Sequence, residues 1–394
     1  MASHGIKDRV AIVGMGCTPF REHWDKGVDD LSLEASNEAF AAAGITKDDV
    51  DAYWLGTAQS GMSGITLSRA LQLHDKPVTR VENYCASGSE ALRQACYAVA
   101  SGAYDVAMAV GVEKVKDSGY QGLNAFPIPN DGTTRTLTAA GSFSMVAPAY
   151  AEKYGVPMEQ LKRTLARIAS KNHHNGARNP RAQFRREMSV EQICAMPNVA
   201  GDLSVFDCAG VADGSAAAIV VRAEDAHRYT DTPIYVKALS FIAGNGSGLV
   251  DPGYDYTWFP EIAACAKDAY AQAGVTDPAE AARILMSHGA GTVIVTRGAE
   301  GAVVLRGQTF TQIPAFIVEA IDSTGAGDAF NGALACGLAE GMLIEAAVEM
   351  AVAAGALATT GQGAQAAMPS RDRIDRLCRF GRRRDPPWLA LPAE

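Results

Sequence analysis

The sequence predicts an α/β protein in which doubly wound layers carry an inserted loop domain and are followed by a second α/β segment. In residues 10–110, short apolar runs alternate with stretches of helical periodicity. Between 115 and 202 this alternation stops, and Gly, Pro, Asn and Arg become frequent. It resumes after 277 with longer, Ala-rich helical stretches.

The first part of the chain contains four predicted strands separated by three predicted helices. The strands are expected at 10–14, 51–56, 78–82 and 105–110. The helices are expected at 31–43, ending at Gly44, and at 65–73 and 89–100. Because strand and helix alternate, we expect a parallel sheet with helices on both faces.

The later elements define the expected domain boundaries. Helical periodicity appears at 148–154 and 158–171, strand character at 216–221 and 233–238, and an amphipathic helix at 261–272 that stops at Gly274. After Asp277 we expect a helix at 279–287, a strand at 292–296, a hairpin around 298–305, and helices at 328–339 and 344–358. The predicted domains are 1–114 with 203–230, the inserted loop domain 115–202, a partial domain 231–277, a segment 278–380 and a tail 381–394.

Composition narrows the classes of partner and the compartment. With 394 residues, 48% of them apolar, the chain can bury a large core, and its net charge of −9 favours neither nucleic acid nor an anionic membrane. The arginines at 382–384 are interpreted as a solvated tail. Eight cysteines without a CxxC pair, and a start without an apolar leader, predict reduced thiols in the cytoplasm. The low-charge stretch 346–360 contains Glu349 and is expected to be a packed helix.

The first candidate catalytic residue is Cys85, in the segment 83–88, NYCASG. It follows a predicted strand and precedes a predicted helix, so the helix amides and dipole are expected to lower its pKa and favour the thiolate that a nucleophile needs. The small residues Ser87 and Gly88 would leave room for a thioester. The alternative is an inert buried thiol, since cysteine is among the most buried residue types.

Three ordered blocks in residues 10–276 resemble the thiolase family, chiefly sterol-carrier-protein-type thiolases and acetyl-CoA acetyltransferases. The blocks are 82–91, 175–184 and 207–218. The resemblance implies that Cys85 takes an acyl group from acyl-CoA, either for condensation with a second acyl unit or in thiolysis of a 3-ketoacyl-CoA. It also implies a homodimer paired through N-terminal sheets, CoA as the substrate carrier, and neither a metal nor a tightly bound cofactor.

Thiolases also carry catalytic blocks that this sequence does not contain. The family has a His-Asp/Glu-x-Phe block, a Gly-His-Pro block and a second Cys near a Gly-rich turn, which stabilise the oxyanion, activate the nucleophile and act as acid and base. His288 falls near the first block by count, but its neighbours do not match, and we interpret it as a surface or helix-end histidine. We therefore expect an acyl-Cys85 intermediate with impaired Claisen chemistry.

A second candidate site lies at 322–328, DSTGAGD. Glycines at a helix start would present backbone N–H groups to phosphoryl charge, with Gly325, Ala326 and Gly327 forming an anion hole. Asp328 would be the base that takes a proton from a hydroxyl group. The alternative is an ordinary loop with an acidic cap.

With 292–298 and Gly301, this site resembles the C-terminal third of ribokinase-like carbohydrate kinases. The resemblance implies a sugar hydroxyl as the group that Asp328 deprotonates, a monovalent-cation site near Asp322 and Thr324, and adenine near 356–363. ATP, magnesium and potassium are implied only if this segment works as a kinase. The family's sugar-binding lobe, lid strands and Asn/Glu magnesium block are missing from the sequence.

The two resemblances meet at Asp277 without a Gly/Ser-rich linker. Such a switch within a domain is typical of recombination, a deletion between two genes or a sequence error. Three hypotheses follow: an impaired thiolase-like acyltransferase, an ATP-dependent carbohydrate kinase, and a non-catalytic chimera whose exposed sheet edges lead to oligomerisation or aggregation.

Overall fold

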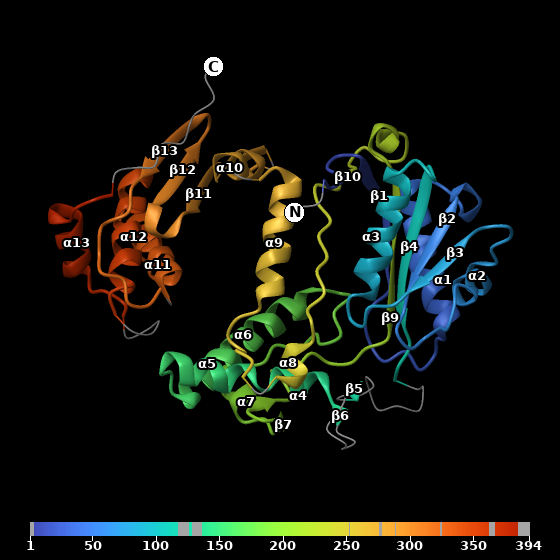
Figure 1. Cartoon of the computed structure of the whole chain (residues 1–394), viewed down its shortest axis with the longest axis horizontal. Coiled ribbons are helices and arrows are strands. Elements are labelled where there is room, and N and C mark those ends of the chain that lie inside the picture. Colours follow the sequence, from blue (N-terminus) through green and yellow to red (C-terminus); the bar gives the residue numbers. More distant parts are fainter. Residues whose placement is uncertain are drawn as a thin grey trace. The chain divides into compact units, whose positions relative to one another are not determined.

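The computed structural model describes residues 4–116, 126–127, 136–251, 253–275, 278–287, 289–323, 325–361 and 367–384. The chain forms two compact units (Figure 1). The first comprises Met1–Ala151 and Pro157–Ala273, and the second comprises Glu152–Val156 and Gly274–Glu394.

A six-stranded sheet, in the order β10-β1-β9-β4-β2-β3, organises the first unit. Its strands are β1 (Val10–Cys17), β2 (Ala52–Gly56), β3 (Val78–Val81), β4 (Val106–Glu113), β9 (Gly214–Arg222) and β10 (Ile234–Tyr235). The four strands predicted from the first part of the sequence are confirmed. These four strands run in one direction, as expected, because β2 pairs parallel with β3 and β4, and β1 and β4 are both antiparallel to β9. The sheet as a whole is mixed, because β9 lies between β1 and β4. The strand expected at 233–238 is reduced to the two residues of β10.

Helices cover both faces of this sheet, as predicted. They are α1 (Val28–Ala43), α2 (Ile65–Leu71) and α3 (Ser87–Ala100), with short 3-10 turns η1 (Lys47–Asp49) and η2 (Ala223–Arg228). Residues of α1 and α2 form one core with Leu55, Met108 and Ile219. Residues of α3 form a second core with Trp54 and Val220. Because successive side chains of a strand point to opposite faces of the sheet, the strands supply an apolar surface to the helices on each face.

The inserted region contributes helices and short strand pairs. Its elements are β5 (Phe126–Pro127), β6 (Thr136–Leu137), α4 (Ala139–Phe143), α5 (Val146–Tyr154), α6 (Met158–Arg178), α7 (Val190–Cys194), β7 (Asn198–Ala200) and β8 (Leu203–Ser204). Helix α6 extends beyond the predicted 158–171 and packs on α7 through Ala166, Ala169 and Ile193. After β10 come α8 (Ser247–Val250) and α9 (Pro260–Ala273), and α9 stops at Gly274 in the left-handed conformation, φ +69°.

The second unit contains a three-stranded antiparallel sheet and four helices among its described residues. Its elements are α10 (Pro278–Ser287), β11 (Thr292–Thr296), η3 (Gly298–Glu300), β12 (Ala302–Arg306), β13 (Thr309–Ile313), α11 (Ala326–Ala339), α12 (Ile344–Ala358) and α13 (Arg371–Phe380). The predicted hairpin is confirmed, with η3 as the turn between β11 and β12. Helix α12, which contains most of the low-charge stretch, packs in the core of this unit, as expected.

Helix α13 was not predicted from the sequence, and the arginine run that follows it is not the solvated tail that was expected. The Ile317 N–H donates to the Arg382 carbonyl at 2.8 Å, and the Arg384 N–H donates to the Ala315 carbonyl at 2.9 Å. The Arg383 guanidinium lies 4.7 Å from the centre of the Phe316 ring. Residues 382–384 are therefore held against the second unit and are not a solvated tail.

Three further observations bear on function. Among the described residues, no helix is both long and apolar enough to cross a bilayer. In the same part of the chain, no group of three or more His, Cys, Asp and Glu side chains is placed to hold a metal ion. All eight cysteines are free thiols.

Candidate active sites

Cys85 lies in a tight turn between β3 and the start of α3. Tyr84 adopts the left-handed conformation, φ +48°, which reverses the chain just before the cysteine. The Ser87 hydroxyl fixes this turn, because it accepts a hydrogen bond from the Asn83 N–H at 2.9 Å and donates one to the Tyr84 carbonyl at 2.7 Å. The thiol is exposed, two residues before a 14-residue helix. A nucleophile placed here lies beside the first helical turn, whose leading amides have no acceptor within the helix; the Ser87 N–H donates to the Tyr84 carbonyl at 3.1 Å.

Glycines let the first turn of α3 lie directly on the sheet. A Cβ at Gly56, the last residue of β2, would lie 2.5 Å from the Ser87 carbonyl oxygen. A Cβ at Gly111 of β4 would lie 3.6 Å from the Gly88 Cα. At Gly88 itself, no described heavy atom lies within 4 Å of the position that a Cβ would take. The turn that carries Cys85 therefore packs closely on the end of β2, and there is free space beside Gly88.

Glu113, at the end of β4, orders the loop after β2. Its carboxylate accepts hydrogen bonds from the Ser60 hydroxyl at 2.7 Å, the Thr57 hydroxyl at 3.1 Å and the Ala58 N–H. Arg80 of β3 donates to the Thr57 carbonyl at 2.8 Å. This loop follows Gly56, which contacts the start of α3, so Glu113 supports the surroundings of Cys85. Glu113 was not among the residues predicted from the sequence to belong to a site.

Asp213 connects the two ends of the inserted region, where the chain leaves β4 and enters β9. Its side chain is completely buried and accepts from the Lys114 ammonium at 2.8 Å and from the backbone N–H groups of Val115, Lys116 and His23 at 2.8 to 3.0 Å. Burial alone would raise the pKa of Asp213, but the hydrogen bond from Lys114 and the three backbone donors together lower it. One carboxylate thus joins the chain leaving β4 to the chain entering β9.

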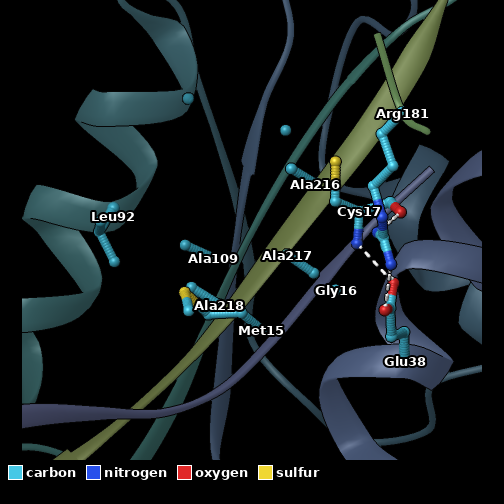
Figure 2. Close-up of a pocket in the computed structure, with 12 residues that line it drawn as sticks. Met15, Gly16, Cys17, Glu38, Leu92, Ala109, Arg181, Ala216, Ala217 and Ala218 are labelled. Atoms are coloured by element: carbon cyan, nitrogen blue, oxygen red, sulfur yellow. Dashed lines mark hydrogen bonds and ion pairs between the residues drawn. The ribbon is translucent and has the colours of Figure 1, made fainter. Parts of the chain in front are cut away.

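Arg181, in the second of the three sequence blocks, fastens the inserted region to β1 and α1. Its guanidinium contacts both carboxylate oxygens of Glu38, at 2.5 and 2.9 Å, and donates to the Cys17 carbonyl. The Cys17 N–H donates to Glu38 at 2.8 Å. The Arg181 hydrogen bonds, followed by that of Cys17, lower the pKa of Glu38 to about 2. Figure 2 shows this ion pair at one side of a hollow.

That hollow, of about 570 Å³, lies on the face of the sheet that carries α3. Its lining is mostly apolar and small, and it includes Gly88 in the first turn of α3. The lining residues are Met15, Gly16, Cys17, Glu38, Gly88, Leu92, Ala109, Gly111, Arg181, Ala216, Ala217 and Ala218. Met15 is 53% exposed there, so part of this sheet face is not covered by α3.

The second candidate site lies at the start of α11 in the second unit. Gly325 is the N-cap residue, and its φ of +79° explains the glycine. Asp328 is exposed in the first turn of α11, and the space where a Gly327 Cβ would lie is open. The Ile321 and Asp322 N–H groups donate to the Thr359 carbonyl at 2.7 and 3.1 Å, so the end of α12 holds the loop. Thr324 is outside the described residues.

The structure keeps some predicted site residues together and assigns others to different units. Gly325, Ala326, Gly327 and Asp328 share one helix start, with Asp322 just before it. Cys85 belongs to the first unit. Of the stretch expected near adenine, residues 356–361 are described, and Gly355 approaches this helix start, because its Cβ would lie 3.2 Å from the Ala326 carbonyl oxygen. His288 is outside the described residues.

Comparison with known proteins identifies two families in succession. Residues 10–224 match the thiolase N-terminal domain, and residues 260–371 match the pfkB family of carbohydrate kinases. An acetyl-CoA acetyltransferase of Methanothermobacter thermautotrophicus is 35% identical over 282 residues, which are 68% of this chain and 70% of that protein. Sterol carrier protein 2 of Bos taurus is 30% identical over 253 residues, which are 60% of this chain and 45% of that protein.

Among solved structures, an Ltp2-ChsH2(DUF35) aldolase is similar with a TM-score of 0.58 and 25% sequence identity. The similarity covers 69% of this chain and 71% of that chain. The chain thus spans about 70% of the length of the acetyl-CoA acetyltransferase and of the aldolase, and less than half of the length of sterol carrier protein 2.

Proposed function

The chain belongs to the thiolase family and continues into a ribokinase-like segment, and on that premise we propose that it is a thiolase-type acyltransferase in which Cys85 takes the acyl group from acyl-CoA. The observation that carries this proposal is the position of Cys85. It is an exposed thiol in a fixed turn at the N-terminal end of α3. Neither inert burial nor a disulfide accounts for it.

The proposed step is transthioesterification. The Cys85 sulfur attacks the carbonyl carbon of the thioester, a new C–S bond forms, and the bond to the CoA sulfur breaks. The thiol proton leaves Cys85, and CoA departs as the thiol after taking up a proton. First-turn amides of α3 have no partner within the helix and are suited to stabilise the oxyanion.

We propose that the reaction stops largely at the acyl enzyme. Condensation needs a second group to remove a proton from the acceptor acyl unit and to form the carbanion. The thiolase blocks that carry such groups are missing from residues 277–394, where the sequence follows the pfkB family. Acylation of Cys85 should therefore exceed condensation and thiolysis.

Exposed cations of the inserted region support CoA as the acyl carrier. Arg167, Arg185 and Arg186 are exposed, and no ion partner lies near them in the part of the chain that the structure describes. CoA carries phosphate groups, and arginine binds phosphate through paired N–H donors. The inserted region is thus suited to the anionic end of the carrier.

The proposal includes a homodimer formed along β3 and a cytoplasmic location. Strand β3 is an edge of the sheet, and Met62 just before α2, Ile65 at the start of α2 and Tyr84 after β3 are 96%, 72% and 63% exposed. An edge strand with apolar neighbours favours pairing with another chain. Eight free thiols favour a reducing compartment. Light scattering during size-exclusion chromatography measures the molar mass in solution, and a mass of one chain, 41.3 kDa, would contradict the dimer.

The decisive test is intact-protein mass spectrometry after brief incubation with acetyl-CoA. We expect one acetyl group on the wild-type chain and none on Cys85→Ala. Cys336→Ala is the matched control, because Cys336 is the other exposed cysteine. A folded sample without an adduct, or labelling that persists in Cys85→Ala, would refute the proposal.

The pfkB match and the glycine-rich start of α11 favour a second candidate, an ATP-dependent carbohydrate kinase. ATP, magnesium and potassium enter only through this segment. Thermal stabilisation by ATP that is lost in Asp328→Asn would support this candidate. If neither acetyl-CoA nor ATP has an effect, the chain is a non-catalytic chimera.

A further inference from the structure

The C-terminal helix α13 and the residues after it carry a concentrated positive charge. Residues 371–384 contain seven arginines, two aspartates and no lysine, in a chain whose net charge is −9. We propose that this segment is a binding surface for single-stranded nucleic acid. The net charge predicts no such partner for the surface as a whole, and this segment is a local exception to that expectation.

Two arginines anchor the segment. Arg371 pairs with Glu340 at 2.6 Å and with Asp375 at 3.0 Å. Arg383 pairs with Glu349 and lies over the Phe316 ring. Together with the backbone hydrogen bonds of residues 382 and 384, these contacts hold both ends of the segment against the second unit.

The other five arginines point to solvent. They are Arg373, Arg376, Arg379, Arg382 and Arg384, which are exposed and have no ion partner among the described residues. The first three are spaced by three residues along α13, so they follow one side of the helix. The opposite side is apolar, and its Ile374 and Leu377 pack in the core of the second unit. The outward arginines are thus presented from a fixed scaffold.

The chemistry of this surface favours nucleic acid over a membrane. A helix that lies in a bilayer must bury its apolar face in lipid, and in α13 that face is already packed in protein. Guanidinium groups bind phosphate oxygens through paired donors and stack on bases.

Phe380 favours a single strand over a duplex. It follows Arg379 directly and is 79% exposed, so its ring is open to a ligand. An exposed aromatic ring among arginines is a stacking platform for unpaired bases. In a duplex the faces of the bases are hidden from such a ring.

The number of outward arginines sets the expected salt dependence. Five phosphate contacts on a single strand give a slope of log K against log salt of about −3.5. Binding should therefore weaken about 100-fold between 50 and 200 mM salt. Removing three contacts should reduce the slope to about −1.4, or a loss of about sevenfold over the same range.

The experiment is fluorescence anisotropy of a labelled 12-nucleotide oligo(U) with the full chain, at both salt concentrations. The test variant is Arg373→Gln, Arg376→Gln and Arg379→Gln together. The matched control is Lys7→Gln, Lys267→Gln and Arg306→Gln, which removes the same charge at exposed sites outside this segment. We expect the test variant to lose affinity and slope, and the control to keep both. Phe380→Ala should weaken binding at least about fivefold without changing the slope.

Several results would overturn the inference. Equal losses in the test and control variants would mean that the binding is unspecific attraction of charge. Tighter binding to a duplex of mixed sequence, or to phosphatidylserine vesicles, would assign the surface to another class of partner. No binding at 50 mM salt by a chain with unchanged melting would remove the surface altogether.

Discussion

Replacing Asp213 by Asn would remove the negative charge that the buried Lys114 ammonium contacts at 2.8 Å. In the folded chain one carboxylate oxygen accepts from Val115 and Lys116, and the other accepts from His23 and the Lys114 ammonium. Asparagine keeps one acceptor oxygen and turns the other into a donor. The Lys114 side chain is 6% exposed, so its ammonium cannot replace the lost carboxylate charge with water unless the chain rearranges.

The expected cost is about 3 to 5 kcal/mol of the free energy of unfolding of the first unit, the range for breaking a buried ion pair from one side. Urea titration followed by far-ultraviolet circular dichroism measures it as a lower midpoint of that unit's transition. The double variant Asp213→Asn with Lys114→Met should recover part of the loss, because both members of the buried ion pair are then removed together.

The matched control is Asp29→Asn, which breaks an exposed ion pair with Arg69 whose side chains are 43% and 68% exposed. It should cost less than about 1 kcal/mol. If Asp213→Asn lowers the free energy of unfolding no more than Asp29→Asn does, the buried contacts of Asp213 do not stabilise the two ends of the inserted region, and the reasoning from burial and hydrogen bonds is refuted.

Three other predictions concern the remaining contacts. The pKa of Glu38 is lowered to about 2 from 4.5, so its contribution to stability is present above pH 4.5 and is lost as the pH falls toward 2. In Glu38→Gln, the loss of stability at acid pH should therefore be less steep than in the wild-type chain. An unchanged acid dependence would contradict this. Gly16→Ala should destabilise the first unit by about 1 to 3 kcal/mol in urea titration, because its Cβ would lie 2.0 Å from a backbone oxygen of α1. Gly88→Ala is the control and should have a small effect, because the space for its Cβ is open. Equal effects of the two substitutions would count against close packing at Gly16. Gly325→Ala should cost about 1 to 2 kcal/mol in the second unit, because φ is +79° there, while Gly327→Ala should unfold at nearly the wild-type midpoint.

The sequence predicted the helices and strands of both units better than their arrangement. Periodicity located β1 and α12 because each has a regular apolar pattern. It could not place β9 between β1 and β4, because an apolar run of this kind does not reveal the direction of a strand or its neighbours. Helix α13 was missed because arginines surround the few apolar residues that it buries.

For the sites, the two motif residues Cys85 and Asp328 were identified from local sequence, since each lies near the start of a helix that follows a turn. Their roles stay predictions. Glu113 and Asp213 were not singled out, because a single carboxylate in a sequence looks like ordinary surface polarity until its burial and donors are known. Arg181 lay in a block that was noted, but its contact with Glu38 joins segments far apart in the chain.

The position of β9 also determines when the first sheet is completed during synthesis. Val10 pairs with Arg222, so both neighbours of β1 are absent until more than half of the chain has been made. At 5 to 20 residues per second, this interval lasts roughly 10 to 40 s. Throughout it, both edges of β1 lack their partner strands, and unpaired edges of this kind are prone to associate with other chains.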